Sequence, residues 1–219
     1  MSINQLFTHP RTTKKAFTYN VSSALINRAL SLDVVKNYLK ISLNDKTQDE
    51  LINLFIDSAT LFGEKYTNRD FINKTYTTFR DNFLDCFELR RSKVSDVASV
   101  KYLVDDVLTT VATTVFGFTN VTDYAEIFLK EDQVWPTDVD NIPQAVEIIF
   151  TAGYGTATAN IPIDIRIALL SHVAFMFENR GDCDLDGSAS NLPLNTNNIY
   201  DKNRIINIGS CSNAHLQTH

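Results

Sequence analysis

The pattern of apolar positions is most regular between Thr47 and Tyr66, in TQDELINLFIDSATLFGEKY. Apolar or small residues recur there at the spacing of one helix face, namely Leu51, Leu54, Phe55, Ser58, Phe62 and Tyr66. Thr47 and Glu50 form a capping-box pattern, in which each side chain satisfies the other residue's backbone N–H. The pattern predicts an amphipathic helix over about 47–66.

Two further helices are predicted from start and stop signals. Ser31 is placed to cap a short helix over about 31–41, SLDVVKNYLKI. Pro162 suits the first turn of a helix over about 162–180, and Gly181 can supply its left-handed end. The middle of this helix is apolar on nearly all sides. It must therefore be buried all round, either in the core or partly against another subunit.

The character of the chain changes between about residues 71 and 152. Segments such as INKTYTTFRDNF, KVSDVASVKYLV and QAVEIIFTAGY are rich in Thr, Val, Tyr, Phe and Ile, and several alternate in polarity. Pro136 and Pro143 bracket a loop, WPTDVDNIP. The region is predicted to form a small antiparallel sheet or sandwich between the helical parts.

These elements predict an α+β fold: a small helical bundle with an antiparallel β-rich insertion at about 71–152 and extended terminal arms. Residues 1–30 are expected to form an N-terminal arm, and residues 31–181 the main domain. Residues 182–219 are polar and rich in Asn and Ser, with one apolar alternation at Arg204–Gly209, and they predict a tail.

Composition narrows the class of protein. The net charge is −6, which argues against duplex DNA binding as the main task, since that depends on Lys and Arg at phosphates. The basic clusters Arg11–Lys15 and Arg90–Lys93 are expected to be solvated faces. Three widely spaced cysteines predict reduced thiols. No membrane span is expected, because the apolar run 161–177 is short and carries charges. No Sec-type signal peptide is expected either, because MSINQLFTHPRTTKKAF lacks an apolar run before a small-residue cleavage site.

The sequence contains no strong enzyme motif: it lacks the P-loop, the G-x-S-x-G elbow and H-E-x-x-H. His172 lies in the middle of the 162–180 helix and is expected to be a packing or interface residue. A hydrolase using His172 with scattered carboxylates is a weaker alternative. The glycines of FTAGYGTATANIP are expected to form a strand-to-helix turn instead of a phosphate loop, because several residues separate them from the helix.

A half-formed calcium motif follows the last helix. Asp182, Asp184, Asp186 and Gly187 match positions 1, 3, 5 and 6 of an EF-hand loop. Position 12 is Pro193, which has no side-chain oxygen, and no exiting helix is predicted. A hydrated turn is therefore preferred, and no metal or cofactor is expected. A calcium-dependent binding module using these three aspartates remains the alternative function.

The order of several motifs between about Leu32 and Gly181 carries a family resemblance. LDVVKNYLKIS precedes QDELINLFIDSATLFGEKYTNRDFI, a strand-rich insert follows, and then VWP, AVEIIFTAGYG and IPIDIRIALLSHVAFMFENRG. In this order the chain resembles the head–tail connector (head-completion or adaptor) proteins of tailed bacteriophages and gene-transfer particles. The Thr-Ala-Gly-Tyr-Gly turn and the proline-initiated apolar helix are the most specific matches.

The resemblance implies a structural virion protein without catalysis or cofactor. Such a protein is made in the host bacterial cytoplasm and forms a ring, typically twelve-fold, at the capsid–tail junction. Its partners would be other copies of itself, the portal protein and a downstream stopper or tail protein. It would extend a channel through which double-stranded DNA passes without sequence-specific binding. A ring makes heterologous contacts, so each subunit needs two different complementary faces.

Interface residues are expected on the 162–180 helix and in the tail. The tail segment Tyr200–Gly209 is the candidate for an arm that orders on the portal by adding a strand. The candidates are Arg166, Leu170, Phe177, Arg180, Tyr200, Arg204, Ile206 and Ile208.

Overall fold

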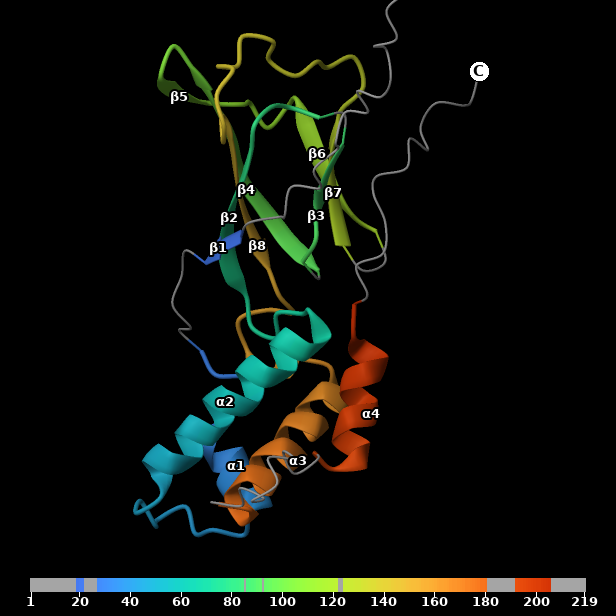
Figure 1. The fold of residues 1–219 in the computed structure, drawn as a ribbon. Coiled ribbons are helices and arrows are strands. Elements are labelled where there is room, and N and C mark those ends of the chain that lie inside the picture. Colours follow the sequence, from blue (N-terminus) through green and yellow to red (C-terminus); the bar gives the residue numbers. More distant parts are fainter. Residues whose placement is uncertain are drawn as a thin grey trace, which may run out of the picture.

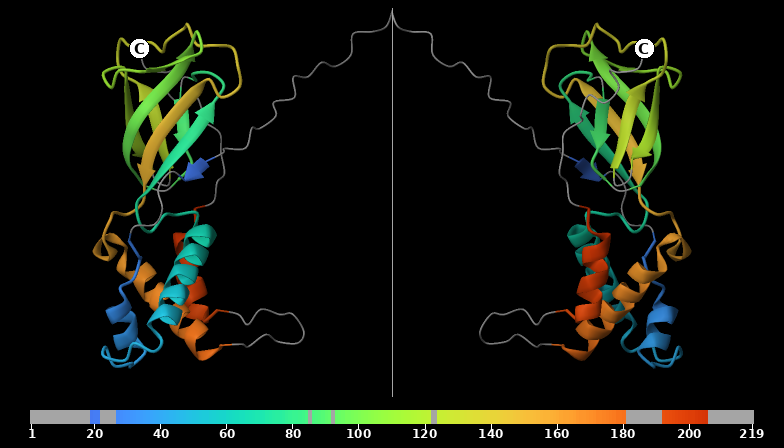
Figure 2. Two further views of the ribbon diagram at one scale, coloured as in Figure 1. Left: turned by 90° about the vertical axis from the view of Figure 1, so that its left-hand side faces the viewer. Right: turned by 90° about the vertical axis from the view of Figure 1, so that its right-hand side faces the viewer.

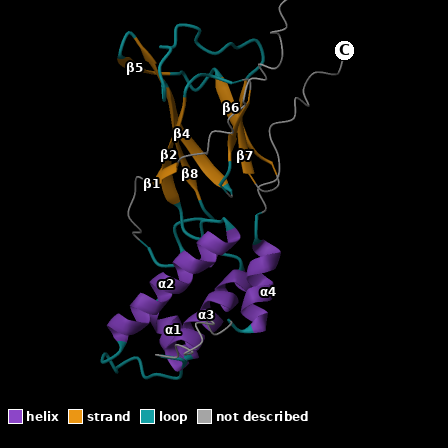
Figure 3. Ribbon diagram, viewed as in Figure 1, coloured by secondary structure: helices purple, strands orange, loops and turns teal. Residues whose placement is uncertain are grey.

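The computed structural model describes residues 19–21, 27–84, 86–91, 93–121, 124–180 and 192–205. Helices and strands are segregated into two halves, a helical half and a β-sandwich (Figure 1; Figure 3). The sandwich lies at one end of an elongated molecule and the helices at the other (Figure 2). The predicted α+β class and the antiparallel insertion are therefore confirmed.

The sandwich consists of two antiparallel sheets. The larger has the order β1-β2-β8-β4-β5 and the smaller β3-β7-β6. The strands are β1 (Tyr19–Val21), β2 (Lys74–Arg80), β3 (Cys86–Leu89), β4 (Val94–Val104), β5 (Val107–Thr110), β6 (Phe116–Val121), β7 (Tyr124–Leu129) and β8 (Val146–Ala152).

The sandwich core follows from the alternation of polarity along its strands. In β8, Val146, Ile148, Phe150 and Ala152 are buried while the residues between them are half-buried. Because side chains alternate across a strand, such a pattern aims one set at the facing sheet. Phe87 and Ile127 of the smaller sheet belong to the same cluster as these residues. Register shifts between β4 and β8 accompany the bends of the long β4.

The helical half combines segments that precede β2 in the sequence with segments that follow β8. Its helices are α1 (Leu32–Tyr38), α2 (Asp49–Thr67), α3 (Ile163–Glu178) and α4 (Leu194–Asn203). The helix α3 packs against each of the other three. A second core joins α1, α2 and α3 around Val35, Ile56 and Leu169, all fully buried.

Three predicted helices are confirmed with small boundary changes, and one predicted cap is wrong. Ser31 does cap α1, its hydroxyl accepting from Val34 N. The capping box of α2 does not form: Gln48 is the N-cap, and the Thr47 hydroxyl donates to Asp45 instead, at 2.6 Å. Thr47 is thereby engaged in the preceding loop. Short polar side chains compete in this way for several local partners.

Parts of the expected arms are ordered elements of the fold. Tyr19–Val21 adds β1 to the edge of the larger sheet, next to β2. Within the expected polar tail, residues 194–203 form α4, whose Tyr200 is fully buried. The helix was not visible in the sequence because Asn is frequent in LNTNNIYDKN and favours turns over helices. Its stability comes from packing on α2 and α3.

The two halves are joined by three crossings of the chain, from β1 to α1, from α2 to β2 and from β8 to α3, and by a buried ionic cluster. Glu64 near the end of α2 accepts hydrogen bonds from Lys74 at the start of β2 and from Phe71 N. Lys74 also lies 3.5 Å from Asp70, which accepts from the Tyr76 hydroxyl at 2.6 Å. Burial raises the pKa of Glu64, and Lys74 opposes that rise. The cluster fixes the end of α2 against the sandwich.

Candidate interaction surfaces

The helix α2 leaves part of its predicted apolar stripe exposed and fully buries a neighbouring side. Its buried residues are small, polar or β-branched: Ile52, Ile56, Ala59, Thr60, Gly63, Glu64 and Thr67. Close packing explains this choice, because a Cβ added at Gly63 would lie 2.8 Å from the Phe71 ring. Leu54 of the predicted stripe is instead 60% exposed, and Leu61, which lies outside the predicted stripe, is 62% exposed. With Ser58 between them, they form the outer α2 face.

The helix α3 is covered on one side only. Ile165, Ala168, Leu169, His172 and Val173 are buried. The prediction that the helix is buried all round is therefore wrong for the single chain, whose helical half is only two helices deep. Ile163 and Ile167 are 68% and 48% exposed, and Leu170 and Ala174 follow at helical spacing, half-buried. These four residues form the outer α3 face.

The two outer faces point away from each other. The buried sides of α2 and α3 meet in one core, so their exposed sides face outward. In the two opposite views of Figure 2, α2 lies toward the viewer in one and α3 with α4 in the other. The helical half thus presents two different apolar surfaces on opposite flanks.

His172 belongs to an aromatic cluster that attaches α4. Its Nδ1 lies 3.3 Å from the Tyr200 hydroxyl, and its ring meets Phe62 edge-on at 5.1 Å. Burial lowers the pKa of His172 to about 4, so the ring is neutral at pH 7. Burial also raises the pKa of the Tyr200 hydroxyl. A buried, neutral histidine among aromatic rings fits the predicted packing role and offers no open site for catalysis.

The remaining predicted interface residues are spread over the helical half. Leu170 is on the outer α3 face, and Arg166, on the neighbouring side of α3, has a buried Nε without a partner among the described residues. Arg180 lies over the Phe177 ring at 4.0 Å, and Arg204 over the Tyr66 ring at 5.3 Å. Tyr200 is buried within this chain. Ile206, Ile208 and the three aspartates, Asp182, Asp184 and Asp186, lie outside the described residues.

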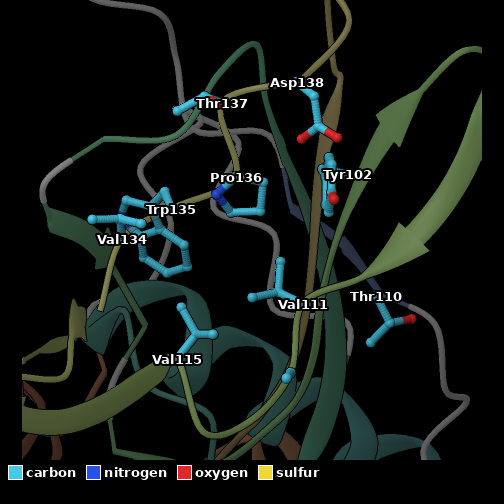
Figure 4. Close-up of a pocket in the computed structure, with 10 residues that line it drawn as sticks. Tyr102, Thr110, Val111, Val115, Val134, Trp135, Pro136, Thr137 and Asp138 are labelled. Carbon is cyan, nitrogen blue, oxygen red and sulfur yellow. The ribbon is translucent and has the colours of Figure 1, made fainter. Parts of the chain in front are cut away.

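A third surface lies at the end of the sandwich farthest from the helices (Figure 4). An open pocket of about 580 Å³ is lined there by residues that include Tyr102, Val111, Val134 and Trp135. The Trp135 ring stacks on Phe83, with 4.7 Å between the ring centroids. Val134 is exposed beside it. The pocket carries mainly apolar side chains and Asp138.

The second basic cluster is partly neutralised. Arg90 pairs with Glu88 at 2.9 Å, and Arg91 lies over the Tyr76 ring at 4.6 Å. Among the described residues no group of three or more His, Cys, Asp or Glu is arranged to hold a metal ion. In the same part of the chain, no helix has the length and hydrophobicity needed to cross a membrane.

Comparison with known proteins gives a structural likeness only. No protein-family model matches the chain, and no curated protein matches it in sequence. A chain from the neck of an empty gene transfer agent (GTA) particle, computed with C6 symmetry, shares the fold with a TM-score of 0.72 and 19% identity. The match covers 87% of this chain and 97% of that one.

Two further solved structures agree. A chain of the virion of a native gene transfer agent particle has a TM-score of 0.69 and 20% identity, covering 87% of this chain and 96% of its own. A chain from the neck of a native GTA particle with C12 symmetry has a TM-score of 0.66 and 20% identity, covering 87% and 97%. At this identity the likeness shows a common fold, which extends over both halves of the molecule.

Proposed function

We propose that the chain is a structural, non-enzymatic component of the neck of a phage-like or gene-transfer particle. The observation that carries the proposal is the fold shared with neck chains over nearly their whole length, 97% in two cases. Sequence motifs and fold therefore agree, although fold alone does not fix function. The site chemistry is consistent, because the surfaces described above are apolar contact faces.

Within the neck, the chain forms a ring at the capsid–tail junction, docks on the portal protein and supports the next stopper or tail protein. The neck structures that share its fold were computed with six-fold and twelve-fold symmetry, which supports a cyclic arrangement. Double-stranded DNA passes through the ring without sequence-specific binding. A net charge of −6 favours sliding over adhesion to phosphates.

We propose that the portal-binding part of the predicted segment Tyr200–Gly209 lies after Ile205. Residues up to Ile205 are held by this chain, because Ile205 N donates to Thr67 O at 2.8 Å and Asn68 donates to Ile205 O at 2.9 Å. Tyr200 is therefore occupied within the subunit. The proposed arm starts at Ile206 and includes Ile208, with Arg204 exposed at its base.

Imaging of particles tests the proposed function. The chain is fused to a small tag at its N-terminus, and purified particles are examined by cryo-electron microscopy with and without tag-binding antibody. We expect density for a ring of this fold, and antibody, at the capsid–tail junction. Particles lacking the chain are expected to accumulate as tailless heads. Label on the capsid surface or along the tail, or tailed particles without the chain, would contradict the proposal.

A further inference from the structure

We infer that the outer α2 face of one subunit packs against the outer α3 face of a second copy of this chain, with the two helices antiparallel. The inference rests on the proposed ring and names the surface that builds it. Leu54 and Leu61 on α2, and Ile163 and Ile167 on α3, are large apolar residues left at least 48% exposed. Scattered apolar residues are ordinary on a surface, but a stripe along a helix indicates a partner.

The placement of the two faces identifies the partner as a second copy. The faces differ in sequence and lie on opposite flanks of the helical half. A contact between unlike faces is heterologous, and repeating it gives a closed ring when the rotation between neighbouring copies closes. A two-fold contact would instead need one face to match itself. The geometry therefore supports a cyclic assembly over a simple dimer.

The side chains of the two faces are complementary in size. On α2 the order is Leu54, Ser58, Leu61, and on α3 it is Ile167, Leu170, Ala174. In an antiparallel pair with Leu61 beside Ile167, the small Ser58 meets Leu170 and Leu54 meets the small Ala174. Alternating large and small residues let two helices approach closely and pack without voids.

The spacing of the residues favours the antiparallel direction, because positions 61, 58 and 54 and positions 167, 170 and 174 are both separated by three and then four residues. Lys65 ends the α2 stripe and Glu50 begins it, and both are exposed. Antiparallel packing brings Lys65 within a turn of Asp164, an opposite-charge pair, and Glu50 opposite Glu178, a like-charge pair. Parallel packing would also give one pair of each kind, Glu50 with Asp164 and Lys65 with Glu178, so the end charges are compatible with either direction. The spans are similar, since Glu50 to Lys65 is about 23 Å and Asp164 to Glu178 about 21 Å at 1.5 Å per residue.

Cysteine cross-linking between differently tagged chains tests this contact. One chain carries Leu61→Cys and the other Ile167→Cys; they are mixed at high concentration and treated with a short bismaleimide. We expect a cross-linked dimer in the mixture and only the wild-type background in either variant alone. The wild-type chain, with Cys86, Cys183 and Cys211, gives that background.

A matched variant tests the direction. Leu54→Cys replaces a residue as exposed as Leu61, seven positions away on the same face. With the Ile167→Cys chain it should cross-link several-fold less efficiently than Leu61→Cys. Equal or greater efficiency for Leu54→Cys would overturn the antiparallel register. A cross-link in Leu61→Cys alone would overturn the heterologous contact.

Assembly measurements complete the test. Leu61→Arg should raise the concentration needed for oligomers about tenfold or more in native mass spectrometry, with unchanged circular dichroism. Val107 is an equally exposed residue on the sandwich, and Val107→Arg should leave the concentration needed for oligomers unchanged. Failure of the free chain to form any oligomer or mixed cross-link would overturn this inference. The imaging of particles would still decide the proposed function, since another surface could then build the ring.

Discussion

At the scale of single residues, Gly153 explains why the Thr-Ala-Gly-Tyr-Gly segment is specific. It has φ of +140°, and a Cβ there would lie 2.7 Å from the backbone of Asn73. Asn73 N in turn donates to Gly155 O at 2.9 Å. The glycine thus lets the chain leave β8 beside the start of β2, where the two halves meet.

Gly153→Ala is expected to lower the free energy of unfolding by about 2–3 kcal/mol, because it adds backbone strain and a contact with backbone that cannot move. Gly117→Ala is the control. Its Cβ would meet only the ring of Phe128, which is partly exposed and free to shift, so a loss below about 1 kcal/mol is expected. Urea unfolding followed by circular dichroism measures both, and equal losses would contradict the explanation.

The buried His172 is expected to make the stability of the fold depend on pH. In the unfolded chain its pKa is near 6.5, whereas burial holds it at about 4 in the folded chain. Below pH 6.5 the unfolded state therefore binds a proton that the folded state does not, and stability falls as pH decreases toward 4. Compared with His172→Gln, the wild-type chain should lose about 2 kcal/mol more between pH 7 and 4.5. The measurement is the midpoint of urea unfolding of each chain as a function of pH. The same pH dependence in both chains would show that His172 does not titrate in this way.

At the scale of elements, α4 is expected to be part of the folded domain. A chain ending at Ile205 keeps Tyr200 in its aromatic cluster and should unfold at the wild-type temperature. A chain ending at residue 191 exposes His172 and Phe62, which contact Tyr200. It should lose about 3–5 kcal/mol, comparable to removing a large buried side chain. Thermal unfolding of the two truncated chains measures this difference. Equal melting temperatures would mean that α4 does not contribute to the stability of the domain.

The sequence predicts elements better than it predicts which side of them is buried. The helices α1, α2 and α3 and all but one of the strands fall within the predicted regions, because periodicity and turn residues are local signals. The buried side of α2 was missed because Gly63 and Ala59 are small, and close approach of neighbouring elements is a tertiary property. The predicted stripe is engaged in part within the chain, since Phe55 packs on the core and Phe62 contacts Tyr200, whereas Leu54 stays exposed.

At the scale of the whole molecule, the buried cluster of Glu64, Asp70 and Lys74 is expected to hold the halves in register. Lys74→Met leaves two buried carboxylates without their cation, which should destabilise the chain by about 3–5 kcal/mol. Lys101→Met, which breaks the more exposed pair with Glu147, should lose less than about 1 kcal/mol. The free energy of unfolding of both variants is measured by chemical unfolding. Similar losses for Lys74→Met and Lys101→Met would contradict a special role for the Glu64–Asp70–Lys74 cluster.

The position of the sandwich between α2 and α3 also has a kinetic consequence. During synthesis α1 and α2 leave the ribosome early, but their partner α3 follows only after residues 68–162. Closing so long a loop is entropically unfavourable, and such distant contacts slow folding. Pairing of β2 with β8 brings Lys74 and Ala152 together first and so shortens the effective loop. The sandwich is then expected to fold before the helical half. The outer α2 and outer α3 faces would therefore form only when the subunit is complete.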